Sequence, residues 1–146
     1  LMESQKEVRD MGGTMRLGAY ACKVLPKHGG KATRAFEAYR TEEISERHRH
    51  RFEVSGKFRA QIEQHGLVVS GRHVLGSGAE LVEMVELPDH PWFLGCQFHP
   101  EFLSKPLAPH PLFAAFVRAA KEARKEAGIQ GGLFAAGGSE VPRLNQ

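Results

Sequence analysis

The sequence contains few cysteines and no long apolar run. Its 146 residues include only two cysteines, Cys22 and Cys96. A secreted disulfide scaffold of this size usually carries more, so we expect a reducing, cytoplasmic environment. No apolar stretch approaches the roughly 20 residues of a membrane-spanning helix, and we expect no membrane partner. The formal net charge of +3 is spread along the chain, which is only a weak indication of an anionic partner.

Length and composition predict one domain between two polar segments. The apolar fraction of 41% and the charged fraction of 25% are ordinary for a globular protein. Residues 1–10 are polar and are expected to form a mobile lead-in. Residues 11–127 hold nearly all the aromatic and β-branched residues and should contain the core. The glycine-rich residues 128–146 are expected to form a flexible tail.

Local patterns predict several strands and at least two helices. Ser55 is a plausible N-cap of a short helix that ends at Gly66, and Pro111 suits the first position of a longer helix that ends at Gly128. The longer helix carries an apolar stripe of Leu112, Phe113, Phe116, Val117 and Ala120. Segment 33–39 suggests a short helix or a loop. Strands are expected at 14–25, 47–54, 67–70, 81–87 and 92–98, which makes the fold class α/β.

The segment with the clearest chemical content is WFLGCQFHPEF, residues 92–102. Pro100 cannot donate to a sheet ladder, so the strand should end beside His99. His99 and Glu101 lie two positions apart, and in an extended chain such residues point to the same side. A carboxylate that accepts from one imidazole nitrogen fixes the tautomer and leaves the other nitrogen able to take a proton. Alternatively, this is a surface turn with a solvated carboxylate.

A base of this kind serves a nucleophile, and neither cysteine fits that role. Strand alternation places Cys96 on the opposite side from His99, so Cys96 is better interpreted as a buried strand residue. Cys22 lies in another strand-like segment and is also expected in the core. Neither belongs to a Gly-x-Cys-x-Gly elbow that exposes a nucleophile. We therefore expect the nucleophile to lie outside this sequence.

The second chemical pattern is RHRHR, residues 47–51. In a strand its arginines share one side, where they can clamp a carboxylate or phosphate. His48 and His50 take the other side. A solvated basic strand, a nucleic-acid patch and a metal site of His48, His50 and His99 are the alternatives. Few aromatics alternate with the basic residues, and no thiolate or carboxylate stands at ligand spacing, so neither a nucleic-acid partner nor a metal is expected.

Four segments, in order, resemble the glutaminase domain of CTP synthases: GGTMRLG, RHRHRFEV, LVEMVELPDHPWFLGCQFHPEF and HPLFAAFVRAA. The resemblance covers most of residues 11–120. It implies the C-terminal part of a class I glutamine amidotransferase domain, with a flavodoxin-like, mostly parallel central sheet and packing helices. It also implies that His99 is the histidine and Glu101 the acid of a Cys-His-Glu triad, and that Arg51 helps to hold glutamine.

The same resemblance carries further expectations about the whole enzyme. CTP synthases make CTP from UTP with ATP and with ammonia released from glutamine. ATP and Mg²⁺ are expected in a synthase domain outside this sequence, and the family forms homotetramers. Without the cysteine nucleophile, this segment alone is expected to be inactive. The alternative functions are a non-catalytic, glutaminase-like binding module and a small basic module for nucleic acid.

Overall fold

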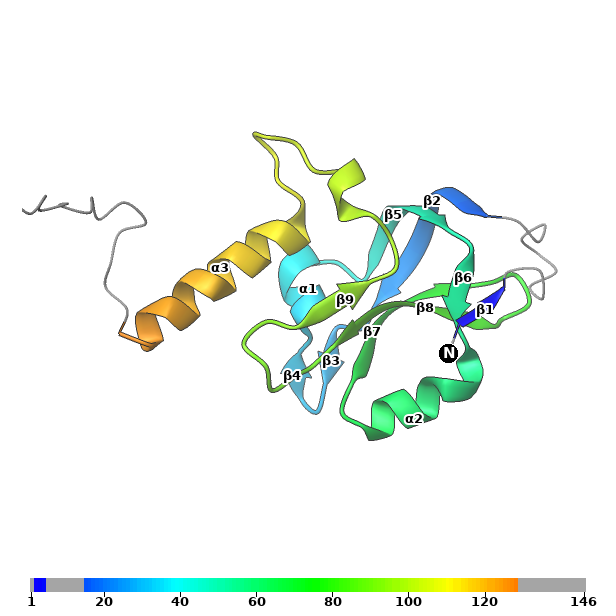
Figure 1. Cartoon of the computed structure of the whole chain (residues 1–146), viewed down its shortest axis with the longest axis horizontal. Coiled ribbons are helices and arrows are strands. Elements are labelled where there is room, and N and C mark those ends of the chain that lie inside the picture. The colour runs from blue at the N-terminus through cyan, green and yellow to red at the C-terminus, as the bar shows by residue number, and fades with distance from the viewer. Residues whose placement is uncertain (1, 5–14, 129–146) are drawn as a thin grey trace, which may run out of the picture.

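The computed structural model describes residues 2–4 and 15–128, so most of the expected lead-in and tail lies outside the described residues. The main feature is a five-stranded sheet with the order β5-β2-β7-β8-β9 (Figure 1). Its strands are β2 (Arg16–Val24), β5 (Glu43–His50), β7 (Val68–Val74), β8 (Glu80–Glu86) and β9 (Leu94–Cys96). Two small pairs accompany it. They are β1 (Met2–Ser4) with β6 (Phe52–Val54), and β3 (Lys27–His28) with β4 (Lys31–Ala32).

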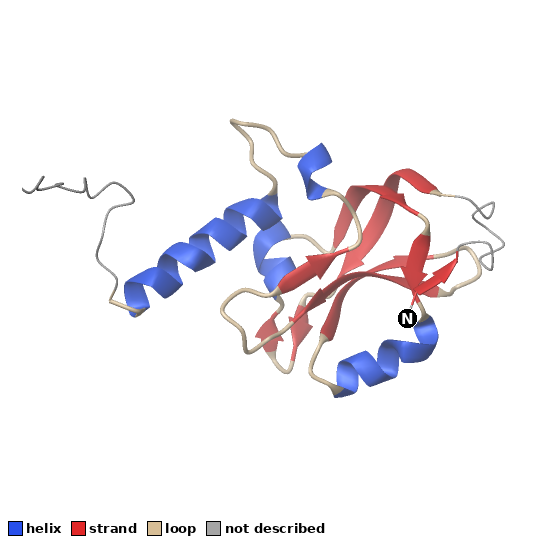
Figure 2. Ribbon diagram, viewed as in Figure 1, coloured by secondary structure: helices blue, strands red, loops and turns tan. Residues whose placement is uncertain are grey.

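The expectation of a mostly parallel sheet is wrong for these residues, because every neighbouring pair in the five-stranded sheet is antiparallel. The connections explain the difference. β7 ends at Val74 and β8 begins at Glu80, whereas a parallel neighbour needs a crossover of roughly a dozen residues or more. The α/β class itself is confirmed, since helices pack beside the sheet (Figure 2).

The sheet is strongly curved, and its two edges approach each other. The pairing of β7 with β8 shifts register on both sides of Gly71, and such bulges bend the strands that carry them. Although β5 and β9 lie at opposite edges, the backbone N–H of His99, just after β9, donates to the carbonyl of Arg47 in β5 at 2.8 Å. The turn that follows β9 therefore lies beside β5 (Figure 1). The result is an antiparallel half-barrel whose open side is bridged next to His99.

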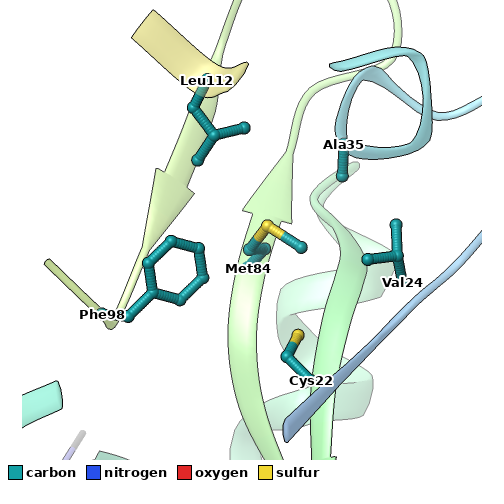
Figure 3. Packing of buried hydrophobic residues seen from close by; sticks show 6 residues of the cluster. All are labelled: Cys22, Val24, Ala35, Met84, Phe98 and Leu112. Atoms are coloured by element: carbon teal, nitrogen blue, oxygen red, sulfur yellow. The ribbon is translucent and has the colours of Figure 1, made fainter. Parts of the chain in front are cut away.

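The apolar core lies inside this curve. Figure 3 shows Met84 of β8 between Phe98 and Leu112 on one side and Cys22, Val24 and Ala35 on the other, and all of these residues are buried. Gly71 of β7 faces Met84 so closely that an added Cβ would lie 2.5 Å from the Met84 Cε atom. The core thus depends on a glycine at this bulge.

Two buried carboxylates of the sheet hold the starts of two helices. Glu86 of β8 accepts from the backbone N–H groups of Arg34 and Ala35, at 2.8 and 3.1 Å, at the start of α1 (Arg34–Tyr39). Glu46 of β5 accepts from Nε2 of His110, at 2.8 Å, at the start of α3 (Pro111–Glu126). In α1 the buried Glu86 carboxylate satisfies unpaired N–H groups of the helix start. In α3 the N-cap residue His110 accepts from the backbone N–H of Leu112 through Nδ1 at 3.3 Å, so its bond to Glu46 ties that helix start to the sheet.

The helices begin and end near the predicted residues, but one predicted face is wrong. Of the apolar stripe on α3, only Leu112 is buried, while Phe113, Phe116 and Val117 are exposed. The buried residues of α3 are instead Leu112 and Ala115, and the helix packs against α1. After Ser55, a 3-10 turn (η3, Gly56–Phe58) leads into α2 (Arg59–Gln64), and Gly66 follows with a left-handed φ of 91°.

Candidate active site

His99 and Glu101 meet as the sequence predicts, although by a different backbone path. The Nδ1–H of His99 donates to Oε1 of Glu101 at 2.7 Å. The residues after His99 are not extended, because Pro100–Phe102 form a 3-10 turn, η4. Pro100 opens that turn, where its missing N–H costs nothing. A short turn thus brings the carboxylate back to the ring just before it.

Three contacts fix the orientation of the His99 ring. Its backbone N–H is bonded to Arg47, as described above, and Nδ1 is bonded to Glu101. The Phe102 ring stacks on it, with centroids 4.9 Å apart and an angle of 19° between planes. The side chain remains 37% exposed. Within the described residues no hydrogen bond engages Nε2, so this ring nitrogen is left open to another group.

The carboxylate of Glu101 is suited to pair with an imidazolium. Its hydrogen bond with His99 lowers the pKa of Glu101 below the ordinary value, so the group is ionised at neutral pH. An ionised carboxylate can orient an imidazole and balance a positive charge that forms on it during a reaction. The pair therefore has the chemical properties of a general base and the acid that orients it.

The two cysteines are poor nucleophiles, as the alternation argument predicts. Burial raises the pKa of the Cys22 thiol to about 12, and burial likewise raises that of Cys96 to about 12. Both thiols are protonated at neutral pH, and thiolate is the reactive form. Cys22 is a core residue, and Cys96 packs against the core while its Sγ donates to the carbonyl of Phe98 at 3.5 Å.

The RHRHR segment divides its side chains as predicted. Glu46 and His48 are buried and His50 is largely covered, whereas Arg47, Arg49 and Arg51 are exposed. The predicted continuous strand is interrupted at Arg51, which forms a bend between β5 and β6. Within the part of the chain described here, no carboxylate pairs with Arg51, so its guanidinium is available to an anionic ligand.

Two side-chain contacts hold the bend that carries Arg51. His50 Nε2 and Glu53 Oε1 are 2.8 Å apart and close the bend from residue 50 to residue 53. Gln97 Nε2 donates to the carbonyl oxygen of Phe52 at 2.9 Å. Gln97 lies two residues before His99, and Phe52 directly follows Arg51. The Arg51 bend and the His99 segment are therefore joined by one hydrogen bond.

Behind this bend lies a buried polar network that sequence reasoning missed. Arg16 is fully buried, bonds Glu83, lies 3.4 Å from Glu53 Oε1 and sits over the Tyr20 ring. His48 Nε2 lies 3.5 Å from Glu83 Oε2. Burial raises the pKa of Glu83 to about 7, and burial, together with Arg16, lowers the pKa of His48 to about 3. The alternation of β5 indicated that His48 points inward, but no local pattern identifies its partners.

The alternative of a metal site finds no geometric support among residues 15–128. The His48 and His50 rings lie near each other, with centroids 5.1 Å apart. However, no group of three His, Cys, Asp or Glu side chains in the described residues is arranged to hold a metal ion.

None of the described helices is long and apolar enough to cross a bilayer.

Comparison with known proteins defines the class of this domain. Residues 2–119 match the family described as Glutamine amidotransferase class-I. The chain therefore belongs to the class I glutamine amidotransferases. Within that class the match is to CTP synthases, which confirms the resemblance seen in the sequence. The CTP synthase of Methanothermobacter thermautotrophicus is 55% identical over 84% of this chain, and that of Geobacter sulfurreducens is 58% identical over 82%.

A solved structure agrees with this assignment. The glutaminase domain of CTPS from Trypanosoma brucei, with bound acivicin, superimposes with a TM-score of 0.66 at 33% identity over 77% of this chain. This chain covers 42% of that domain, and it spans 21% of the length of the two CTP synthases above. It thus corresponds to a fraction of those proteins.

Proposed function

We propose that this chain provides the base and part of the glutamine pocket of the glutaminase site in a CTP synthase. The observation that supports this most directly is the hydrogen bond from His99 Nδ1 to Glu101 at 2.7 Å, which leaves Nε2 to act as the base. The nucleophilic cysteine belongs to the part of the relatives that this chain does not span, since the Cys22 thiol is buried, the Cys96 thiol is half-buried and both are protonated at neutral pH.

In the proposed reaction His99 relays a proton in each of two steps, first from the thiol to the departing nitrogen and then from water to the sulfur. Nε2 takes the proton of the incoming thiol, and the thiolate attacks the side-chain amide carbon of glutamine. The resulting imidazolium, stabilised by Glu101, returns the proton to the departing amide nitrogen, so that ammonia leaves and a thioester remains. His99 then takes a proton from water as the water attacks the thioester, which releases glutamate and restores the thiol.

Arg51 is proposed to hold the α-carboxylate of glutamine. Its guanidinium is exposed on a bend joined to the His99 segment, and a planar guanidinium binds a carboxylate through two parallel hydrogen bonds. In the whole protein, ammonia released here would convert UTP to CTP. ATP and Mg²⁺ would bind in the synthase region, outside this chain, and the enzyme would assemble as a homotetramer.

The test is the replacement His99→Ala in the full-length enzyme. We expect CTP formation from glutamine to fall by several orders of magnitude, on the order of 10⁴ or more, because the thiol loses its base. CTP formation from added ammonium chloride should be unchanged, since free ammonia bypasses the glutaminase step. Equal loss with both nitrogen sources would contradict the proposed role. His65→Ala, at the exposed end of α2, is the matched control.

A further inference from the structure

Gln97 occupies the connection between the two parts of the candidate site. Its backbone N–H donates to the carbonyl of Glu83 at 2.9 Å, which continues the pairing of β9 with β8 beyond Cys96. Its side-chain amide donates to the Phe52 carbonyl at 2.9 Å. The residue is therefore anchored to the sheet by its backbone, while its side chain reaches across to the bend that follows β5.

Apart from the Gln97 hydrogen bond, few contacts among the described residues hold the Arg51 bend on the side that faces β9. His50 and Glu53 close the bend from within, and Glu53 also approaches Arg16, so the inner side is tied to the buried network. On the side of β9, the hydrogen bond that a side chain makes with residues 51–52, among the residues that the structure describes, is that of Gln97. A long, exposed arginine samples many rotamers. If its backbone is fixed, a larger fraction of these rotamers places the guanidinium where it can bind the substrate carboxylate.

We infer that Gln97 is a positioning residue that sets Arg51 relative to His99 through the Phe52 carbonyl, and so tunes the affinity for glutamine. The inference rests on the proposed function, since it assumes that Arg51 binds the substrate carboxylate. The hydrogen bonds of Gln97 within the described residues go to the carbonyl groups of Glu83 and Phe52 and not to the His99 ring. Its loss therefore affects substrate binding and leaves the proton transfers of His99 intact.

The first measurement compares two variants of the full-length enzyme, Gln97→Leu and Gln97→Glu. Leucine removes the donor, and glutamate keeps the size but presents only acceptor oxygens to the Phe52 carbonyl. Both should raise the KM for glutamine by about 3-fold to 10-fold, the effect of one hydrogen bond. We expect kcat with saturating glutamine and CTP formation from ammonium chloride to be unchanged. Gln64→Leu, on the exposed face of α2, is the matched control.

A double-mutant cycle with Arg51→Ala decides whether Gln97 acts through Arg51. Arg51→Ala alone should raise the KM for glutamine strongly, and adding Gln97→Leu should then raise it no further. If the two effects multiply independently, or if both Gln97 variants leave KM unchanged, the positioning role is overturned while the function of Arg51 stands. If Arg51→Ala alone leaves KM unchanged, the proposed glutamine pocket fails, and the inference fails with it. Should Gln97→Leu also reduce the ammonia reaction, Gln97→Glu decides in its place.

Discussion

The backbone N–H of His99 donates to the carbonyl oxygen of Arg47 at 2.8 Å, and this bond joins the two edges of the sheet. β5 and β9 are the outer strands of the sheet, so only its curvature brings them together. The candidate base and the arginine-rich strand are consequently neighbours, although about 50 residues separate them in the sequence. The site is thus located where the half-barrel comes closest to closing.

The Glu101→Gln substitution tests the orienting carboxylate. Glutamine keeps the shape and an acceptor for Nδ1 but removes the negative charge that stabilises the imidazolium. We expect kcat with glutamine to fall by about 10²-fold, at the lower end of acid–base effects, because the Glu101 side chain is 55% exposed and water screens its charge. The KM for glutamine and the ammonia reaction should be unaffected. Steady-state kinetics with both nitrogen sources measure this, and Glu122→Gln on α3 is the control.

The buried imidazole of His48 predicts a pH-dependent contribution to stability. Its pKa falls from the model-peptide value of 6.5 to about 3 on burial. Below about pH 6.5 the unfolded chain binds a proton at this histidine, whereas the folded chain does not until about pH 3. Protonation therefore favours unfolding across this window. Between pH 7 and pH 5.5, His48 should lower the free energy of unfolding by about 1 kcal/mol.

Glu83 acts in the opposite direction, so the effect of His48 must be measured as a difference. Burial raises the pKa of Glu83 from 4.5 to about 7, and the folded state therefore gains stability relative to the unfolded state as pH falls from about 7 to about 4.5. Urea unfolding of the parent and of His48→Gln at both pH values separates the two contributions. The parent should lose more stability than the variant on acidification. Identical pH dependences would show that His48 is not held neutral; His28→Gln, exposed in β3, is the control.

Gly71→Ala tests the close contact inside the sheet. The added methyl group would lie 2.5 Å from Met84 Cε and 3.0 Å from Met84 Cβ. Because Met84 is buried in the core, the clash must be relieved by shifting the strands, and we expect a loss of about 1–3 kcal/mol in the free energy of unfolding. Gly76→Ala is the matched control, since no heavy atom lies within 4 Å of its added Cβ. If urea unfolding gives the same loss of stability for Gly71→Ala and Gly76→Ala, the close contact between Gly71 and Met84 is refuted.

Local patterns in the sequence predicted much of the secondary structure and the main chemical pair. The alternation at 44–50 fixed which side chains of β5 point inward. The strand expected at 92–98 is shorter, since β9 ends at Cys96, and Pro100 opens the 3-10 turn after His99. Glu101 reaches His99 through a 3-10 turn where an extended chain was expected. The contact forms because His99 keeps an extended backbone just before the turn, which lets the carboxylate two residues later reach its ring.

The tertiary structure decided which residues that lie far apart in the sequence contact each other. Local spacing does not predict the antiparallel half-barrel. It also does not predict three contacts between distant residues: Arg16 with Glu83, His110 with Glu46, and Gln97 with Phe52. The sequence determined which residues are strand-forming, turn-forming and chemically active, since those properties depend on near neighbours. Strand order and curvature depend on the burial of the whole chain, and they alone brought Arg51 and His99 to one place.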